Sequence, residues 1–403
     1  MIVRMFLLWA QVASPGHRAE ATAALAKAFL HADLSGDDRR EAETALTAML
    51  DDPSPGVRLA LAESLASSPD APRHIMVALA GDQNEIAAIV LRRSPVLVDA
   101  DLVDCAALGD APAQVAVASR AAVSPAVSAA LAEIACPAAL ASLAANEGAA
   151  IGHSALIRMI ERHGDAPEVR ESLLARADLP ADVAQAIAAA LARQLAGFVV
   201  HCGWLSSERS NRVAREAREK TAVALSAASG RDDVRRLVDY LRRSDQLTPA
   251  LILRAILSGQ TTFVEAAFGE LSGLASHRVA SILRDPHGFG FRALFRRSGL
   301  APVLQPAFES ALSAFARTRH GGAGGAARLS RELVRRALAG CETLPSGEAT
   351  RLLALLRRFE VEAARDDARE AAESLADEAA LAMVLKHAPE ALGEGELTRR
   401  RAA

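Results

Sequence analysis

A motif of polar and apolar positions is repeated along the first half of the chain. Each copy has an Asp, three or four turn-forming residues, and then a helical pattern that opens with Val or Ile. The copies begin at Asp52, Asp82, Asp110 and Asp165. The last two are separated by about twice the usual spacing, so a degenerate copy is expected at residues 137–143. In the first copy Val57, Leu61 and Leu65 recur every four residues, which is typical of one buried helix face.

Each copy has room for two short helices. An Asp before a helix can accept hydrogen bonds from the free N–H groups of its first turn, and Pro suits the first helical position. Second helices are therefore expected to begin at Pro72, Pro95, Pro125 and Pro180. A hairpin of this size cannot bury its apolar face alone, so neighbouring hairpins must stack. The pattern predicts an all-α protein: an α-solenoid of short HEAT-like helical hairpins, followed by a further helical region.

Composition agrees with this fold class. Hydrophobic residues make up 51% of the 403 residues but aromatic residues only 3%, and Ala, Leu and Arg, which favour helices, are abundant. The β-branched and aromatic residues that favour strands are scarce. We expect four parts: a solenoid over residues 1–200, a second, Arg-rich helical region over 201–318, a Gly-rich linker over 319–327, and C-terminal helices with a tail over 328–403.

Several longer sequence segments resemble those of a known family. They lie at residues 57–66, 90–103, 161–165 and 247–259. Over roughly residues 1–320 the chain resembles an uncharacterised alphaproteobacterial family with HEAT-like helices, which is filed as a domain of unknown function. The resemblance implies a bacterial origin and a helical-repeat fold, and it transfers no catalytic residue.

Charge is distributed unevenly along the chain. The net charge is −3, but residues 1–200 carry 15 basic and 24 acidic side chains, whereas residues 201–320 carry 18 and 11. A pI near 6.4 argues against a dedicated nucleic-acid binder. The candidate interaction surface consists of arginines: Arg92, Arg93, Arg209, Arg212, Arg215, Arg218, Arg235, Arg236, Arg242 and Arg243. Part of this set could bind phosphate, but acidic residues alternate with it, so a solvated, salt-paired face is the favoured interpretation.

Candidate chemical motifs have simpler structural interpretations. The Asp residues at 99, 101 and 104 lack the Gly and distal Glu of a calcium loop, and capping is expected for them. Residues 161–165 cluster ionisable groups at a helix end, where we expect Gly164 to form a left-handed turn and Asp165 to cap the next helix. The four Cys residues are far apart, without a Cys-x-x-Cys pair. We therefore expect no catalytic residue, no bound metal and no cofactor.

These observations favour a non-enzymatic protein–protein interaction scaffold or regulatory adaptor, with another protein or a second copy as partner. One alternative is a nucleic-acid-binding HEAT-like protein that uses the basic middle region. Another is a regulator that binds an anionic small ligand. A cytoplasmic location is expected, because the apolar run at residues 5–13 is short for a cleaved leader and the longest apolar stretch, 184–200, contains Arg193.

Overall fold

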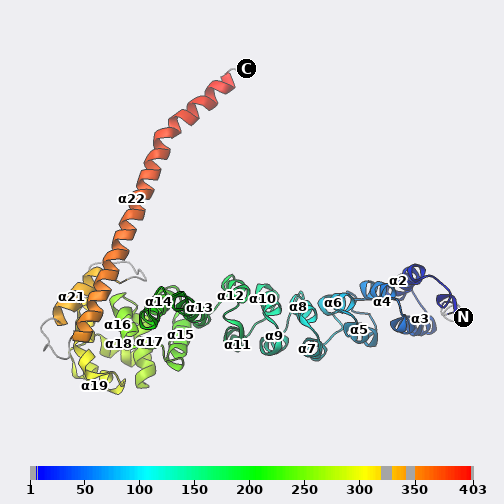
Figure 1. Ribbon diagram of the computed structural model, residues 1–403, viewed down its shortest axis with the longest axis horizontal. Coiled ribbons are helices and arrows are strands. Elements are labelled where there is room, and N and C mark those ends of the chain that lie inside the picture. The colour runs from blue at the N-terminus through cyan, green and yellow to red at the C-terminus, as the bar shows by residue number, and fades with distance from the viewer. Residues whose placement is uncertain (1–5, 7, 319–328, 342–349, 401–403) are drawn as a thin grey trace. The chain divides into compact units, whose positions relative to one another are not determined.

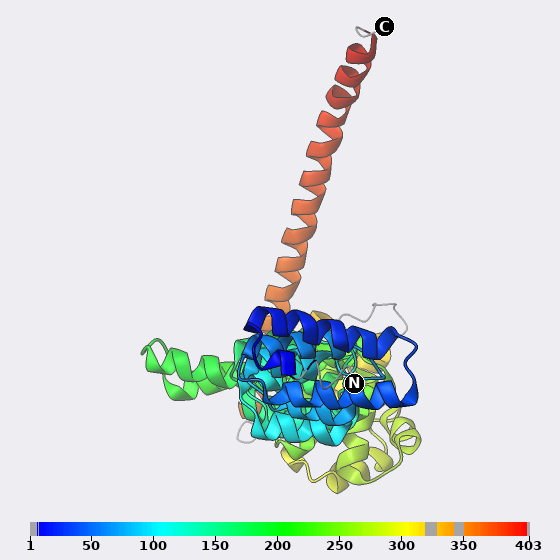
Figure 2. The ribbon, with the colours of Figure 1, turned by 90° about the vertical axis from the view of Figure 1, so that its right-hand side faces the viewer.

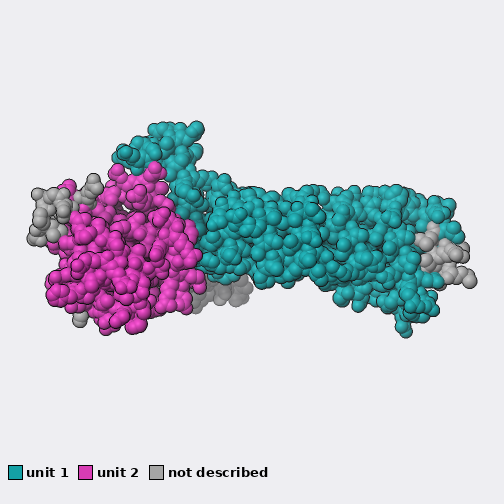
Figure 3. All heavy atoms as spheres, turned by 90° about the horizontal axis from the view of Figure 1, so that it is seen from below, with its two compact units in different colours: residues 1–210 teal, residues 211–403 magenta. Residues whose placement is uncertain are grey.

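The computed structural model describes residues 6, 8–318, 329–341 and 350–400, and within these ranges it contains helices but no strand. An isolated bridge joins Val123 and Ala149. The all-α prediction is therefore confirmed. The chain divides into two compact units, residues 1–210 and 211–403 (Figure 3). The predicted Gly-rich linker lies outside the described residues, as do Met5 and Leu7 of the apolar N-terminal run.

Unit 1 is a row of helical hairpins (Figure 1). Its hairpins are α2 (Pro15–His31) with α3 (Gly36–Ala48), α4 (Pro55–Leu65) with α5 (Arg73–Ala80), α6 (Asn84–Arg93) with α7 (Asp99–Leu108), α8 (Ala111–Ala118) with α9 (Pro125–Ile134), α10 (Pro137–Ala145) with α11 (His153–His163), and α12 (Pro167–Leu174) with α13 (Ala181–His201). The short 3-10 helix η1 (Met49–Asp51) precedes α4. Even-numbered helices pack on one another in one layer, and odd-numbered helices from α7 onward pack in the other. Figure 2 looks along this row.

Helix starts in unit 1 follow the sequence pattern at most positions. The degenerate copy is a helix, α10, which begins at Pro137. Pro72, Pro125 and Pro180 stand at the starts of α5, α9 and α13. The start predicted at Pro95 is wrong, because α7 begins only at Asp99. In the segment before α7, the Val96 carbonyl accepts from Arg73 and the Val96 N–H donates to the Ser94 hydroxyl, so side chains satisfy both backbone groups of Val96 outside a helix.

The repeated Asp residues link successive hairpins. Arg18 donates two hydrogen bonds to Asp52, at 2.7 and 2.9 Å, and Arg58 donates two to Asp82, at 2.6 and 3.0 Å. Asn84 donates to Asp110 at 2.6 Å in the same way. Each donor lies on a first helix, and its Asp precedes the first helix of the next hairpin. The capping that the sequence predicts is found at Asp110, which accepts from the Ala113 N–H.

Elsewhere the Asp residues satisfy loop N–H groups. Asp52 accepts from Ser54 and Asp82 from Gln83, and neither of these bonds reaches the first turn of a helix. The predicted left-handed turn at Gly164 is also wrong, because Gly164 has a φ of −67°. A Cβ at Gly164 would meet the Ile160 carbonyl oxygen at 2.5 Å, so close packing is what this position requires of its glycine.

Unit 2 packs its helices around phenylalanines. The helices are α14 (Ser207–Ala228), which begins at the end of unit 1, α15 (Arg231–Arg243), α16 (Pro249–Leu257), α17 (Thr261–Ser272), α18 (Ser276–Leu283), α19 (Phe289–Arg297), the 3-10 helix η2 (Pro302–Leu304), α20 (Gln305–Thr318), α21 (Arg331–Cys341) and α22 (Thr350–Arg400). The rings of Phe268, Phe291, Phe295 and Phe308 are fully buried, with neighbouring centroids 5.2–6.1 Å apart. The α22 helix continues to Arg400, whereas the sequence predicts a tail at this end of the chain.

Candidate interaction surfaces

The arginines of the candidate surface are distributed over both units. Arg92 and Arg93 are exposed at the end of α6 in unit 1, and Arg209 is the last member of the set in that unit. The others lie on α14 and α15 in unit 2.

The arginines of α15 have acidic partners. Arg235 pairs with Asp232, Arg236 with Asp233 and Arg243 with Asp239 on the same helix. Arg242 reaches Glu270 on α17. Exposed pairs of this kind contribute little to stability, but they reduce the positive field that a phosphate group would experience.

The arginines of α14 lie beside a cavity of mixed charge. Arg212 and Arg215 line a space of about 220 Å³ together with Glu216, Glu219 and Arg358. Arg358 donates to Glu216 at 3.0 Å. Burial raises the pKa of Glu219, although the Thr248 hydroxyl and the Arg254 charge act in the opposite direction. The cavity therefore presents carboxyl groups as well as cations to any ligand.

A buried ion pair beside this cavity was not predicted from the sequence. Arg254 on α16 is only 2% exposed and donates two hydrogen bonds to Glu362 on α22, at 2.5 and 3.0 Å. Its guanidinium lies 4.6 Å from the ring centroid of Phe359, and Lys220 lies 3.0 Å from Glu362. Burial alone would raise the pKa of Glu362, but Arg254 and Lys220 together hold that pKa below its ordinary value. The sequence does carry a signal for a buried ion pair, namely an Arg within the apolar run 251–257. A cation buried in such a run needs an acidic partner.

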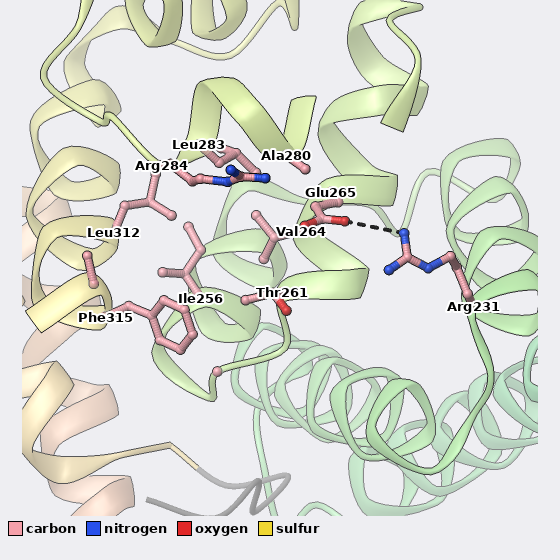
Figure 4. Close-up of a pocket in the computed structure, with 12 residues that line it drawn as sticks. Arg231, Ile256, Thr261, Val264, Glu265, Ala280, Leu283, Arg284, Leu312 and Phe315 are labelled. Carbon is pink, nitrogen blue, oxygen red and sulfur yellow. Dashed lines mark ion pairs between the residues drawn. The ribbon is translucent and has the colours of Figure 1, made fainter. Parts of the chain in front are cut away.

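A larger cavity of about 860 Å³ lies elsewhere in unit 2 (Figure 4). Its apolar lining includes Ile256, Val264, Leu283, Leu312 and Phe315. Arg231 and Glu265 form a loose ion pair of 3.7 Å on one side. Arg284 also lines the cavity, and no carboxylate of the described residues lies within ion-pair distance of its guanidinium. The cavity is mostly apolar and contains one uncompensated cation, which is the composition typical of a site for a small ligand.

Unit 1 presents an apolar surface at its end, on the second half of α13. The helix has 21 residues, whereas α11, on which it packs, has 11. At 1.5 Å per residue, the additional ten residues extend about 15 Å past that neighbour. The first ten residues of α13 include its buried side chains, but no residue from 191 to 204 is buried. Together with the start of α14, this end forms the teal lobe that stands apart from the rest of unit 1 (Figure 3) and the green segment that extends sideways in Figure 2.

The exposed residues of this end are large and apolar. Leu195 is 55% exposed, Phe198 54% and Trp204 68%, and the rings of Phe198 and Trp204 meet edge to face at 5.8 Å. By length and composition α13 is the one helix among the described residues that could cross a membrane, with a mean hydropathy of 1.6 over its most apolar window. A third of that window is buried within the structure. Sequence reasoning noted this stretch for its hydropathy but did not separate its buried half from its exposed half.

The remaining candidate motifs have structural partners. Asp99 accepts a hydrogen bond from the Ser124 hydroxyl at 2.6 Å. Asp101 accepts from the Val98 N–H and from Arg73, which lowers the pKa of its carboxyl. Among the described residues no group of three or more His, Cys, Asp or Glu side chains could hold a metal ion. Burial raises the pKa of the Cys105 thiol, which makes it a poor nucleophile.

Comparisons with known proteins identify a family. A family model described as uncharacterised proteins conserved in bacteria, DUF2336, matches residues 86–346. This match confirms the predicted resemblance to an uncharacterised bacterial family, but it begins at residue 86 instead of residue 1 and continues beyond the predicted end, to residue 346. No curated protein and no solved structure matches the chain.

Proposed function

We propose that this chain, which belongs to the uncharacterised bacterial family DUF2336, is a non-enzymatic protein–protein interaction scaffold that acts in the cytoplasm. The exposed second half of α13 carries the proposal. Leu191, Leu195, Phe198, Val200 and Trp204 are all exposed within 14 residues. Leu191, Leu195 and Phe198 share one face of the helix, and the Phe198 ring contacts Trp204. Soluble proteins rarely leave a large apolar patch uncovered, and such a patch marks a contact site for another macromolecule.

The solenoid supports this proposal through the rigidity it gives to the patch. The first half of α13 packs on α11, and hydrogen bonds from Arg18, Arg58 and Asn84 join the first four hairpins of the row to one another. The exposed half of α13 is therefore a continuation of an anchored helix, and little conformational entropy is lost when a partner binds to it. The arginines of α15 are paired with acidic side chains, which reduces the positive field available to a phosphate group. We therefore favour protein binding over nucleic-acid binding.

Affinity purification of the tagged chain from its native lysate tests this function. The wild type should be compared with Phe198→Gln, and Leu108→Gln is the matched control because Leu108 is a 90% exposed apolar residue on α7. We expect a stoichiometric protein that survives a high-salt wash with the wild type and with Leu108→Gln but is lost with Phe198→Gln. The same set of proteins from all three chains would contradict the proposal.

The large cavity of unit 2 favours a second candidate function, a regulator that binds an anionic small ligand. Arg284 beside an apolar lining fits a ligand with an apolar body and one anionic group. Thermal-shift measurements with dodecanoate, nucleotides and cyclic dinucleotides test it. A shift given by one of these and abolished by Arg284→Ala, but not by Arg92→Ala, supports this function. Equal shifts with both variants, or none with any compound, count against it.

A further inference from the structure

One row of side chains runs the length of α13 and becomes uncovered toward its end. The row consists of Ala184, Ala188, Leu191, Leu195, Phe198 and Cys202. Successive members are three or four residues apart, an average of 3.5, which is the repeat of a coiled-coil seam. The two Ala residues are half-buried within unit 1, and the row is exposed from Leu191 onward. A seam that begins in a packed core and continues into solvent is suited to a further helix.

The residues that flank the row indicate which partner it fits. On α13 itself the flanking positions are Ala192 and Val199 on one side and Gln194 and His201 on the other, so α13 places no Lys, Arg or carboxylate beside the seam. The start of α14 packs against the same half of the helix, where the Ser210 hydroxyl donates to the Ala196 carbonyl. Arg193, the one charged residue in this half, lies on the opposite side of the helix, since residues two apart from Leu195 point about 200° away. A helix that lies in a membrane surface carries a strongly charged face of Lys and Arg opposite its apolar face, which this half lacks. The narrow, neutral-bordered seam therefore fits a protein helix.

We propose that this seam is covered by the same seam of a second copy, with the two α13 helices antiparallel. The inference rests on the proposed function and names its partner. Two α13 seams can meet without like-charge repulsion between the two helices, because the flanking positions of α13 carry no Lys, Arg, Asp or Glu. A twofold axis beside Leu195 sets this residue against its equivalent, and it places Phe198 of each copy opposite Leu191 of the other. The large side chains of Leu191, Leu195 and Phe198 then form the centre of the interface, and the smaller Ala188 and Cys202 meet at its two ends.

The antiparallel orientation follows from charge and size as well. Two parallel helices would place Phe198 against Phe198 and would bring the two solenoids to the same end of the interface. Residues 1–200 carry 15 basic and 24 acidic side chains, so two solenoids side by side would repel each other. The antiparallel arrangement sends the solenoids to opposite ends and leaves the neutral seam as the contact.

Sedimentation equilibrium of the purified full chain, from about 1 to about 100 µM, tests the association. We expect a monomer–dimer equilibrium for the wild type. Leu195→Gln should weaken dimerisation at least about tenfold, because it removes a buried apolar side chain from each copy. Leu108→Gln, on an exposed position outside the seam, should leave the dissociation constant unchanged. A chain that is monomeric throughout this range, or a dimer that Leu195→Gln does not weaken, overturns the inference. Because Leu195 is exposed in the monomer, its replacement leaves helix content unchanged in circular dichroism.

Thiol cross-linking tests the orientation. In a Cys202→Ser background, a short bismaleimide should join two Leu195→Cys chains, since residue 195 meets its own equivalent. Two Phe198→Cys chains should not be joined, whereas a mixture of Phe198→Cys and Leu191→Cys chains should be. Rapid joining of Phe198→Cys to itself, with no product from the mixture, overturns the antiparallel seam. The Cys202→Ser chain alone is the control and should give no dimeric product.

The outcomes separate this inference from the function on which it rests. If the chain is monomeric but the affinity purification still recovers a different protein that depends on Phe198, the second copy is excluded and the scaffold function stands. If the recovered protein is an untagged copy of this chain, both are supported. Binding of the monomer to phosphatidylglycerol vesicles that Leu195→Gln abolishes would instead assign the seam to a membrane surface and overturn both.

Discussion

Arg254 and Glu362 face each other across 108 residues of sequence through two hydrogen bonds and exclude nearly all solvent from the guanidinium. This ion pair joins α16, in the interior of unit 2, to the first half of α22. Because Phe359 covers the guanidinium and Lys220 adds a second cation to Glu362, the pair fixes both the position and the rotation of α22.

Removal of one partner of this pair should be strongly destabilising. In Arg254→Ala the Glu362 carboxylate keeps only Lys220, and we expect a loss of about 3 kcal/mol in the free energy of unfolding. Replacement of both residues by Leu should cost less, because Glu362 is no longer left buried without its partner, and the remaining cost includes the loss of the Arg254 charge 3.9 Å from Glu219. Denaturant unfolding of the full chain, with hydrogen exchange of residues 350–363, measures the effect. Equal losses for the single and double variants would show that the pair does not act as a unit.

The contribution of Glu219 to the stability of the fold should decrease as the pH rises, whereas that of a carboxyl with a lowered pKa increases. Burial raises its pKa in the folded chain, so its ionisation opposes folding, and its favourable contribution is present below the ordinary carboxyl pKa and is lost as the pH rises through the raised value. Glu219→Gln should therefore make the chain at least as stable as the wild type at pH 7. The advantage should shrink below pH 4.5, where Glu219 is protonated in both states. An advantage that is independent of pH would contradict this account.

Asp52 should show the usual acid dependence. Arg18 holds the pKa of the Asp52 carboxyl below its ordinary value of 3.8. The stabilisation is complete above that value and is lost as the pH falls through the lowered pKa. Asp52→Asn should be less stable than the wild type at pH 7, and the difference should diminish below pH 3.8. Chemical unfolding monitored at several pH values measures this, with Asp37→Asn, an exposed carboxyl on α3, as the control.

Gly148 should not tolerate a side chain. A Cβ at this position would lie 2.0 Å from the Ala121 carbonyl oxygen, where the Val123 N–H bonds to the Gly148 carbonyl. Gly148→Ala forces these two backbone segments apart and should cost about 1–3 kcal/mol. Gly16→Ala is the control, since nothing lies within 4 Å of its Cβ and Ala favours the helix. Unfolding curves that coincide for Gly148→Ala and the wild type would contradict the expected clash.

The helical hairpins could be predicted because apolar residues recur at helical spacing in each repeat. Val57, Leu61 and Leu65 lie on one face at helical spacing, and the structure buries all three completely. The partners of the repeated Asp residues could not be predicted in this way, since Arg18 and Arg58 lie 34 and 24 residues before the carboxylates that they bind. Helix starts depend on the local sequence. These bonds depend on the tertiary stacking of the hairpins, which the local sequence does not specify.

The exposed seam was beyond sequence reasoning for a related reason. Hydropathy along α13 is nearly uniform, and the difference between its halves arises because α11 ends ten residues sooner. Arg254 is the opposite case: its apolar neighbours Leu253 and Ala255 indicated burial, although they did not identify Glu362 as its partner. The arginines of α15 conform to the salt-paired face that the alternating charges favoured.

The bonds between hairpins also determine how unit 1 would carry a mechanical load. The ion pairs Arg18–Asp52 and Arg58–Asp82 hold the first two junctions of the row. The third is held by Asn84, which donates to Asp110, and by Arg120, which donates to the Leu91 and Ser94 carbonyls, so each of these bonds has one neutral partner. Hydrogen bonds between two ions are the stronger kind. Tension along the row would therefore part the third junction before the first two, and the three N-terminal hairpins would stay joined.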